Sequence, residues 1–363
     1  MAVGDQYIGA DLSRLSRLHL LRNLSIRGWT QNATTWGLQE LSNVKQLRRL
    51  TLIGRLSDQG LLSVPELPQL EELTVCSTCL RGDGLAVNSR FPAIRKLVIR
   101  DLNLSEDALA NLPSMQSLSE LTLYVNRVDF SRLPDLPSLS RLRIDCAELR
   151  TSDLDRIARL DRLQLLAIRC KNIEPGGFKR NPKFREIKSL EINAPALSSE
   201  DIAAIAGTTQ LRSLVLEGMS LDEVSLGEIA KLQDLESLSL FADYPFSSAI
   251  AIAAKLPKLR VLSLWSEKLQ PTDCLRGLSA VANIERIAIA SMYFKLISPD
   301  ELILPASARY LDLSVSIDYR TEEAILVRNP NVKITISEGW PWSPIVVQED
   351  IWPNWGEEED YLF

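Results

Sequence analysis

One hydrophobic pattern, L-x-x-L-x-L, returns along almost the whole chain and limits the folds that this sequence can adopt. In the segment 210–221 it is formed by Leu211, Leu214 and Leu216. The last apolar residue of each copy falls, in order, at Ile26, Leu52, Val75, Ile99, Leu123, Ile144, Ile168, Ile192, Leu216, Leu240, Leu264, Ile289, Leu313 and Ile336. The intervals between them are 26, 23, 24, 24, 21, 24, 24, 24, 24, 24, 25, 24 and 23 residues. Such a period predicts a solenoid, in which each coil packs on the next.

The repeat resembles the leucine-rich repeat family in both its length and its apolar spacing. The resemblance implies an α/β fold of about fourteen coils. Each coil would add one short parallel strand to a curved sheet on the concave face, and short helices or irregular turns to the convex face. The sequence Ser57-Asp58-Gln59-Gly60-Leu61 is similar to the acid-x-Gly-Leu turn of bacterial and F-box-type members. No F-box sequence is found at the amino end, so a role as a ubiquitin-ligase adaptor is not expected.

The repeat predicts two parts of unequal size. Residues 1–337 form the solenoid and include an amino-terminal capping coil, in which the insertion Trp29–Trp36 would cover the open end of the core. Residues 338–363 form an aromatic carboxy-terminal cap and an acidic tail, because they hold four of the seven tryptophans and seven acids without any Lys or Arg.

Two positions that follow each strand bear on how the coils are joined. Many members of the family that the chain resembles carry Asn three residues after the last apolar residue, where its side chain joins neighbouring coils. In this chain Asn126 alone has Asn at that position. Two residues after the last apolar residue the first twelve coils have mostly small side chains, with Asp101 and Val125 as exceptions. Close stacking of coils explains the small residues, and the bonds between coils must come from other side chains.

Helix starts are predicted on the convex side wherever hydroxyl or acidic residues precede apolar residues at helical spacing. Examples are Ser105-Glu106-Asp107, Thr151-Ser152-Asp153, Ser198-Ser199-Glu200-Asp201 and Pro271-Thr272-Asp273. The interval of 21 residues between Leu123 and Ile144 is too short for a helix and contains Pro134 and Pro137, so an extended segment is expected there.

Charge and composition argue against several classes of partner. The formal net charge is −6, and because the tail carries seven acids, the solenoid is close to neutral at 41 − 40 = +1. Nucleic-acid binding needs a clear excess of clustered bases, so no nucleic acid is expected. No apolar run reaches the length of a membrane span, and the amino end has no signal-peptide pattern. Five cysteines do not suit a secreted disulfide framework, so a cytoplasmic location is expected. The turn that is similar to those of bacterial members of the family implies a bacterial protein.

The residues that could carry chemistry do not form a catalytic or metal site in the sequence. The one histidine, His19, has no partner pattern and is interpreted as structural. The pair Cys76 and Cys79 has the spacing of half a zinc site without a second half, which leaves a redox-sensitive pair as the other interpretation. Cys146 and Cys170 fall at the same place in adjacent coils and are interpreted as packing residues. We expect no cofactor, no metal and no enzyme activity.

The side chains that alternate outward on the concave strands form the predicted binding surface. It is basic in coils four to seven, then acidic and aromatic in coils eight to eleven, with Phe241 and Trp265 in one column. The partner-binding candidates are Arg100, Tyr124, Arg141, Arg143, Arg169, Glu191, Glu217, Phe241, Trp265 and Tyr310. The alternative is a solvated strand face with charges in no particular order.

A protein–protein interaction module without catalysis is therefore the predicted function, with a protein partner of unknown identity and a monomer in the free state. Two alternatives remain. The chain could be an immunity protein that neutralises a toxin, because an acidic chain could cover a basic toxin surface, or it could be a structural subunit of an assembly.

Overall fold

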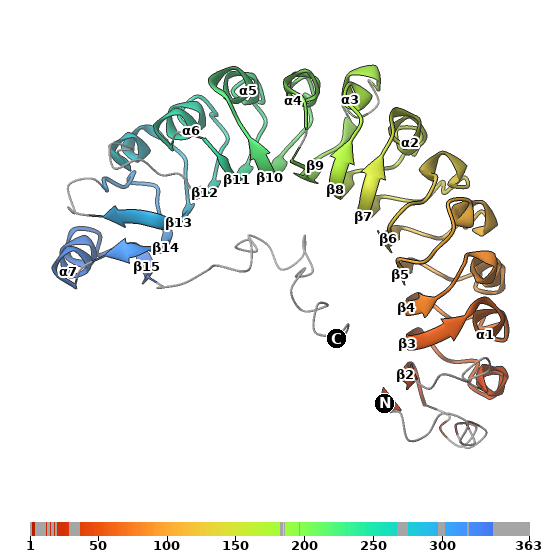
Figure 1. Ribbon diagram of the computed structural model, residues 1–363. Coiled ribbons are helices and arrows are strands. Elements are labelled where there is room, and N and C mark those ends of the chain that lie inside the picture. Colours follow the sequence, from red (N-terminus) through yellow and green to blue (C-terminus); the bar gives the residue numbers. More distant parts are fainter. Residues whose placement is uncertain are drawn as a thin grey trace. The chain divides into compact units, whose positions relative to one another are not determined.

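The computed structural model describes residues 2–3, 12, 15, 18, 20–28, 37–181, 184, 186–195, 197–244, 246–266, 275–296, 302–317 and 319–336. The chain divides into two compact units, Met1–Ile187 and Lys188–Phe363. Within each unit the strands lie side by side in the order of the sequence, and the helices lie on one side of them (Figure 1).

Eight parallel strands are described in the first unit. They are β1 (Ala2–Val3), β2 (Asn23–Gly28), β3 (Arg49–Ser57), β4 (Glu72–Cys79), β5 (Lys96–Arg100), β6 (Glu120–Tyr124), β7 (Arg141–Leu149) and β8 (Leu165–Ile173). Short helices connect them: η3 (Leu38–Asn43), α1 (Asp58–Leu62), η4 (Asp83–Arg90), η5 (Ala108–Asn111), η6 (Phe130–Arg132), α2 (Thr151–Ile157) and α3 (Gly177–Arg180), where η marks a 3₁₀ helix.

Seven parallel strands are described in the second unit. They are β9 (Ser189–Asn193), β10 (Ser213–Ser220), β11 (Ser237–Asp243), β12 (Val261–Trp265), β13 (Arg286–Leu296), β14 (Tyr310–Ile317) and β15 (Lys333–Ile336). The described connections contain α4 (Ser199–Ala206), α5 (Glu223–Ile229), α6 (Phe246–Ala253), η8 (Leu275–Ala280) and α7 (Tyr319–Arg328).

The fourteen strands predicted from the apolar repeat are confirmed, one for each copy from β2 to β15. The register pairs the last apolar residues with one another, for example Leu52 with Val75 in the first unit and Leu216 with Leu240 in the second. All four side chains are at most 1% exposed, so these positions form the core. Strand β1 was not predicted because its two residues lack the pattern.

Among the predicted helix starts that the structure describes, Ser198 caps α4 and Thr151 begins α2, whereas Ser105-Glu106-Asp107 leads into the 3₁₀ helix η5 without a side-chain cap. The Ser57 hydroxyl accepts a hydrogen bond from the Gly60 amide at the start of α1, and Ser198 accepts one from the Asp201 amide at the start of α4. These contacts satisfy amides that have no partner inside a helix. In the 21-residue interval the one described helix is the three-residue η6, so the predicted extended segment contains a single 3₁₀ turn.

Some predictions fall outside the described residues: those for His19, the insertion Trp29–Trp36, the helix start at Pro271 and the cap and tail at 338–363. They stay predictions.

The small residues that follow the strands allow the coils to approach closely, as expected. Gly54, with a φ of +136°, pairs with Gly28, and a Cβ atom at Gly54 would lie 1.8 Å from the Gly28 carbonyl oxygen. Any side chain would therefore collide with the neighbouring backbone, and the positive φ favours glycine as well. Asn126, which the resemblance would assign to a ladder between coils, is exposed.

Asp101 is an exception in the small column because it bonds the coils itself. The carboxylate is 1% exposed and accepts hydrogen bonds from the Leu80 amide at 2.7 Å and the Asn103 amide at 2.8 Å. One coil earlier, the Ser77 hydroxyl donates to the Leu56 carbonyl at 2.8 Å. Burial raises the pKa of Asp101, although the amides favour its charged form.

Asp58 makes a second bond of this kind at the start of α1. Its carboxylate accepts hydrogen bonds from the amides of Arg81, Gly82 and Gly84 at 2.9, 3.1 and 2.8 Å, all of which belong to the next coil. Two acidic side chains, together with Ser77, thus form bonds between coils that the sequence leaves without an asparagine ladder.

We expect Leu214→Ala to lower the free energy of unfolding by about 2 to 5 kcal/mol, because Leu214 is 1% exposed and its removal leaves a cavity. Ser213→Ala, one residue away on the other face of β10, is the control and should cost little. Equal losses of the two variants in denaturant unfolding would contradict the assigned alternation.

We also expect Asp101→Asn to cost about 1 to 3 kcal/mol, because an amide group replaces one of the two acceptor oxygens beside a buried backbone amide. Asp107→Asn is the matched control, since the Asp107 side chain is 70% exposed in its ion pair with Arg132. Thermal and urea unfolding of both variants would test this, and a stability of Asp101→Asn equal to that of Asp107→Asn would argue against a role of Asp101 in joining coils.

Candidate functional site

The strand face consists of the side chains that alternate with the core residues, and it has three columns in each unit. The leading, middle and trailing columns lie three residues before, one residue before and one residue after the last apolar residue of each strand. Adjacent members of a column are register partners, so they are about 4.8 Å apart along the sheet. This spacing decides which side chains meet.

In the first unit the leading column alternates in charge. Arg49, Glu72, Lys96, Glu120 and Arg141 are successive register partners on β3 to β7, and we name them the charge ladder. Arg49 pairs with Glu72 at 3.0 Å, and Arg141 pairs with Glu120 at 2.9 Å. Because these side chains are substantially exposed, each pair contributes about 0 to 1 kcal/mol.

The other basic candidates of the first unit are also engaged within the chain. The Arg100 guanidinium lies over the Tyr124 ring at 4.1 Å, and Arg169 faces Asp145 at 3.9 Å. Arg143 is only 9% exposed and Tyr124 only 8%, so the strip of exposed bases expected from the sequence is smaller than its residue count suggests. Alternation gives the direction of a side chain but not how far its neighbours cover it.

In the second unit the trailing column contains the aromatic candidates. Glu217, Phe241 and Trp265 are successive register partners on β10, β11 and β12, and we name these three residues the aromatic ridge. All three are partly exposed. The register therefore places the two predicted aromatic residues in one column of the strand face.

Beside the aromatic ridge lies a low surface that the sequence analysis missed. In the leading and middle columns of β10 to β12, four of six residues are serine, namely Ser213, Ser237, Ser239 and Ser263. Ser239 and Ser263 are 7% and 4% exposed, so the rings stand beside a floor of short side chains. Sorting the sequence into columns would have found this serine floor.

The remaining candidates of the second unit differ in exposure. Glu191 is 6% exposed, whereas Tyr310 is 43% exposed, with the Arg286 guanidinium at 4.8 Å from its ring centroid. Just before the strands, Arg212 faces Glu236 at 3.5 Å and Arg260 faces Glu285 at 3.6 Å. These arginines are thus matched by acids or a ring within the unit.

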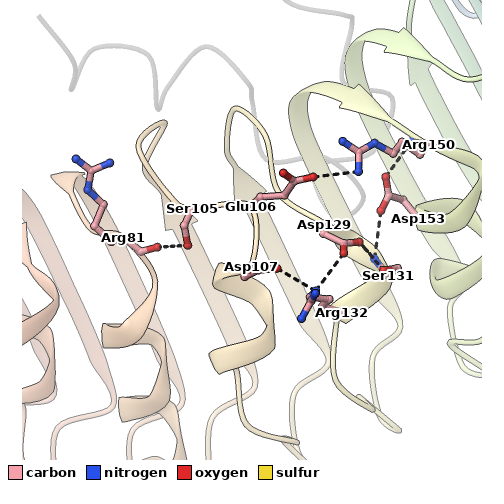
Figure 2. Close-up of polar contacts among 9 residues, drawn as sticks. All are labelled: Arg81, Ser105, Glu106, Asp107, Asp129, Ser131, Arg132, Arg150 and Asp153. Atoms are coloured by element: carbon pink, nitrogen blue, oxygen red, sulfur yellow. Dashed lines mark hydrogen bonds and ion pairs between the residues drawn. The ribbon is translucent and has the colours of Figure 1, made fainter.

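A network of polar side chains joins consecutive coils along one edge of the first unit (Figure 2). Arg132 pairs with Asp107 at 3.0 Å and with Asp129 at 3.2 Å. Arg150 pairs with Glu106 at 3.0 Å, which links the coil after β7 to the coil after β5. Within the described ranges, no three His, Cys, Asp or Glu side chains are grouped so as to hold a metal ion. The network therefore resembles a set of bonds between coils rather than a reactive site.

Two carboxylates of this network share one amide and have opposite pKa shifts. The Ser131 amide donates to Asp129 at 3.0 Å and to Asp153 at 3.2 Å. Burial raises the pKa of Asp153, which is 2% exposed, and the nearby charge of Asp129 raises it further. The Ser131 hydroxyl, its amide and Arg132 lower the pKa of Asp129.

The cysteines of the described chain are free thiols at Cys76, Cys79, Cys146 and Cys170. Cys146 and Cys170 are register partners with their sulfur atoms 3.6 Å apart, and both are buried, which agrees with packing residues in adjacent coils. Within the described part of the chain, no helix combines the length and the apolar character needed to cross a bilayer.

Comparison with known proteins finds likeness only among solved structures. No family model and no curated protein matches the chain. A leucine-rich repeat protein of Leptospira interrogans is 14% identical, with 89% of this chain and 91% of that chain covered and a TM-score of 0.42. An internalin of Listeria monocytogenes is 16% identical, with coverage of 91% and 77% and a TM-score of 0.42. Toll in the Drosophila Toll–Spatzle complex is 14% identical, with coverage of 90% and 53% and a TM-score of 0.42.

These likenesses are too distant to carry a conclusion about function. The repeat itself decides the architecture, since each of the fourteen copies forms one parallel strand, in register with its neighbours within each unit. The fold is a leucine-rich repeat solenoid. In this leucine-rich repeat chain the asparagine ladder of the family pattern is replaced by Asp58, Asp101 and Ser77.

We expect carbon-detected NMR titration to show Asp153 titrating above, and Asp129 below, the ordinary value of 3.8. Because the pKa of Asp153 is raised, the folded protein protonates this carboxylate at a higher pH than the unfolded chain does. As the pH falls through the raised pKa towards 3.8, protonation of Asp153 therefore increases the free energy of unfolding. The contribution of Asp129 is present above pH 3.8 and is lost as the pH falls through its lowered pKa. In Asp129→Asn the pKa of Asp153 should fall; an unchanged or higher value would contradict the coupling.

Proposed function

We propose that the protein is a binding module without catalytic activity that engages another protein on its strand face. The observation that carries the proposal is the pair Phe241 and Trp265, which are register partners and partly exposed on adjacent strands. Aromatic side chains gathered on a surface are enriched among the residues that contribute most to protein–protein binding. A solvated face with side chains in no particular order would not be expected to place two large rings side by side.

The aromatic ridge is held by a rigid part of the second unit, which supports its use in recognition. Phe241 and Trp265 lie on hydrogen-bonded strands rather than on loops, so little conformational entropy is lost when a partner covers them. Just after β11, Tyr244 is 5% exposed and its hydroxyl donates to the Leu240 carbonyl at 3.0 Å. Burial raises the pKa of this phenol well above its ordinary value, so it remains a neutral hydrogen-bond donor.

The arginines of the first unit would act mainly on the rate and specificity of binding. Arg141 is half exposed in its pair with Glu120, and salt screens charges of this kind. Arg143 is 9% exposed, so its truncation would disturb the strand face itself. Arg141 is therefore the better probe of the electrostatic contribution.

We also propose that the protein works in the cytoplasm. A reducing compartment would keep the free thiols of Cys76, Cys79, Cys146 and Cys170 reduced.

We expect Trp265→Ala to weaken partner binding by about 2 kcal/mol or more, because a large ring is lost from the centre of the contact. Quantitative affinity purification with the wild-type chain, Trp265→Ala and Val224→Ala would identify the protein that depends on the ridge. Val224 is a matched control because it is apolar, lies on α5 away from the strand face and is 67% exposed.

Once that protein is purified, binding kinetics at two salt concentrations separate the contribution of the aromatic rings from that of the arginines. Trp265→Ala should raise the dissociation rate at both, while Arg141→Ala should slow association at low salt only. Circular dichroism would confirm that the variants fold. If folded Trp265→Ala retains every protein that the wild type binds, the strand face of the second unit is not the interaction surface.

A further inference from the structure

Two buried thiols lie side by side on the adjacent strands β7 and β8 of the first unit. Cys146 and Cys170 are register partners, and their sulfur atoms are 3.6 Å apart. Further register partners precede and follow the pair on the same two strands. The sheet therefore holds the two thiols together, although 24 residues separate them in the chain.

The spacing of a parallel sheet suits a disulfide bond between these residues. Register partners on adjacent strands have Cα atoms about 4.8 Å apart, and disulfide bonds join Cα atoms that are about 4.4 to 6.8 Å apart. The two sulfur atoms have to approach from 3.6 Å to about 2.05 Å to form the bond. Rotation of the side chains with a small shift of the strands supplies this movement.

The two side chains also have the same local contact in their coils. The sulfur atom of Cys146 lies 3.5 Å from the carbonyl oxygen of Glu148, and the sulfur atom of Cys170 lies 2.9 Å from the carbonyl oxygen of Asn172. Each contact is made two residues further along the chain. Because both thiols are oriented in the same way by their own strands, they remain side by side rather than turned apart.

The two thiols differ in acidity, which assigns them different roles. The Cys146 thiol donates a hydrogen bond to the Cys170 sulfur, and this bond lowers the pKa of Cys170 although burial opposes the change. The same bond, together with burial, raises the pKa of Cys146. Because the thiolate is the form that reacts with oxidants, Cys170 is the sulfur that reacts first, and Cys146 is placed to attack it afterwards.

We propose that Cys146 and Cys170 are a redox pair, which hydrogen peroxide converts into a reversible disulfide bond that fastens the coil of β7 to the coil of β8. In the first step the Cys170 thiolate attacks one oxygen of the peroxide and the O–O bond breaks. Cys170 becomes a sulfenic acid, and the departing hydroxide takes up the proton that Cys170 had released, which gives water.

In the second step the Cys146 sulfur attacks the Cys170 sulfur and the S–O bond breaks. The thiol proton of Cys146 leaves with the hydroxyl group as a second water. Two thiols and one peroxide thus give one disulfide bond and two waters, with the thiols oxidised and the peroxide reduced. A dithiol reductant reverses the reaction by thiol–disulfide exchange.

The burial of the pair limits which oxidants can reach it and what they produce. Cys146 is 5% exposed and Cys170 is 3% exposed. Hydrogen peroxide is nearly as small as water, so a local opening of the strands admits it more readily than a larger disulfide oxidant. The neighbouring thiol then intercepts the sulfenic acid before a second peroxide oxidises it further.

A bond at this place would strengthen one interface between coils. In a solenoid each coil is stabilised mainly by its neighbours, and a covalent bond between two coils opposes their separation. The Glu174 amide donates to the Leu149 carbonyl at 2.9 Å between the same two coils. Exchange of the Glu174 amide with solvent therefore reports on how often this interface opens.

The test treats the folded wild-type chain with hydrogen peroxide and labels the remaining thiols with iodoacetamide in denaturant. We expect labelling of Cys146 and Cys170 to be lost, and trypsin to release the segment 144–150 joined to the segment 170–171. A dithiol reductant should restore the labelling of both. Hydrogen exchange over the segment that contains Glu174 should slow by about tenfold or more in the oxidised chain.

A variant with Cys76, Cys79 and Cys274 replaced by serine keeps Cys146 and Cys170 as its two cysteines and isolates their reaction. In the intact mass of this variant, oxidation should remove two hydrogen atoms and add no oxygen. Circular dichroism would confirm that it folds, and the wild-type chain serves for the same measurement by tryptic mapping if it does not.

Two single variants separate the roles of the thiols. Cys146→Ser should leave Cys170 as a sulfenic acid that dimedone traps, whereas Cys170→Ser should leave Cys146 unreacted. Full labelling of Cys146 and Cys170 after peroxide treatment would overturn the inference, as would a cross-link that forms only after urea has unfolded the chain. An exchange rate at Glu174 that is the same in the reduced and oxidised chains would show that the bond does not fasten the coils.

Discussion

The fixed spacing of a parallel sheet is the constraint on which the other features of this protein depend. Hydrogen bonds between successive strands hold all coils of a unit at about 4.8 Å, so the side chains of each column must fit one another at that distance. Leucines meet leucines in the core, and Gly28 meets Gly54 where the backbones approach most closely. On the strand face the same spacing pairs Arg49 with Glu72 and Phe241 with Trp265.

Because the spacing is the same everywhere, the difference between a structural and a recognition surface lies in what each column contains. In the first unit most of the charged strand-face residues find an opposite charge or a ring within the chain, as Arg141 does with Glu120 and Arg100 with Tyr124. In the second unit the strand face contains two partly exposed rings, Phe241 and Trp265, beside the serine floor. These neighbouring rings are the basis of the proposed function.

The core was predictable from the sequence and much of the polar structure was not. A period near 24 with apolar residues at fixed places leaves one way to bury them, so fourteen strands and their register follow from it. The roles of Asp58 and Asp101 depend on where loop amides point, which no spacing encodes. The low exposure of Arg143 and Glu191, 9% and 6%, depends on the reach of neighbouring side chains. The aromatic column was predicted, and sorting the same strands into columns would also have shown the serine floor.

The alternation of the charge ladder has a consequence for how such a chain can change in length over evolution. Arg49, Glu72, Lys96, Glu120 and Arg141 are partners in succession, and Arg212, Glu236, Arg260, Glu285 and Arg309 alternate in the same way before the strands of the second unit. Deleting the single coil of β5 would bring Glu72 against Glu120, two like charges at one strand spacing, which is destabilising. Deleting the coils of β5 and β6 together would bring Glu72 against Arg141 and restore an attractive pair. Gain or loss of coils in pairs therefore preserves the electrostatic pattern of these segments, whereas loss of a single coil does not.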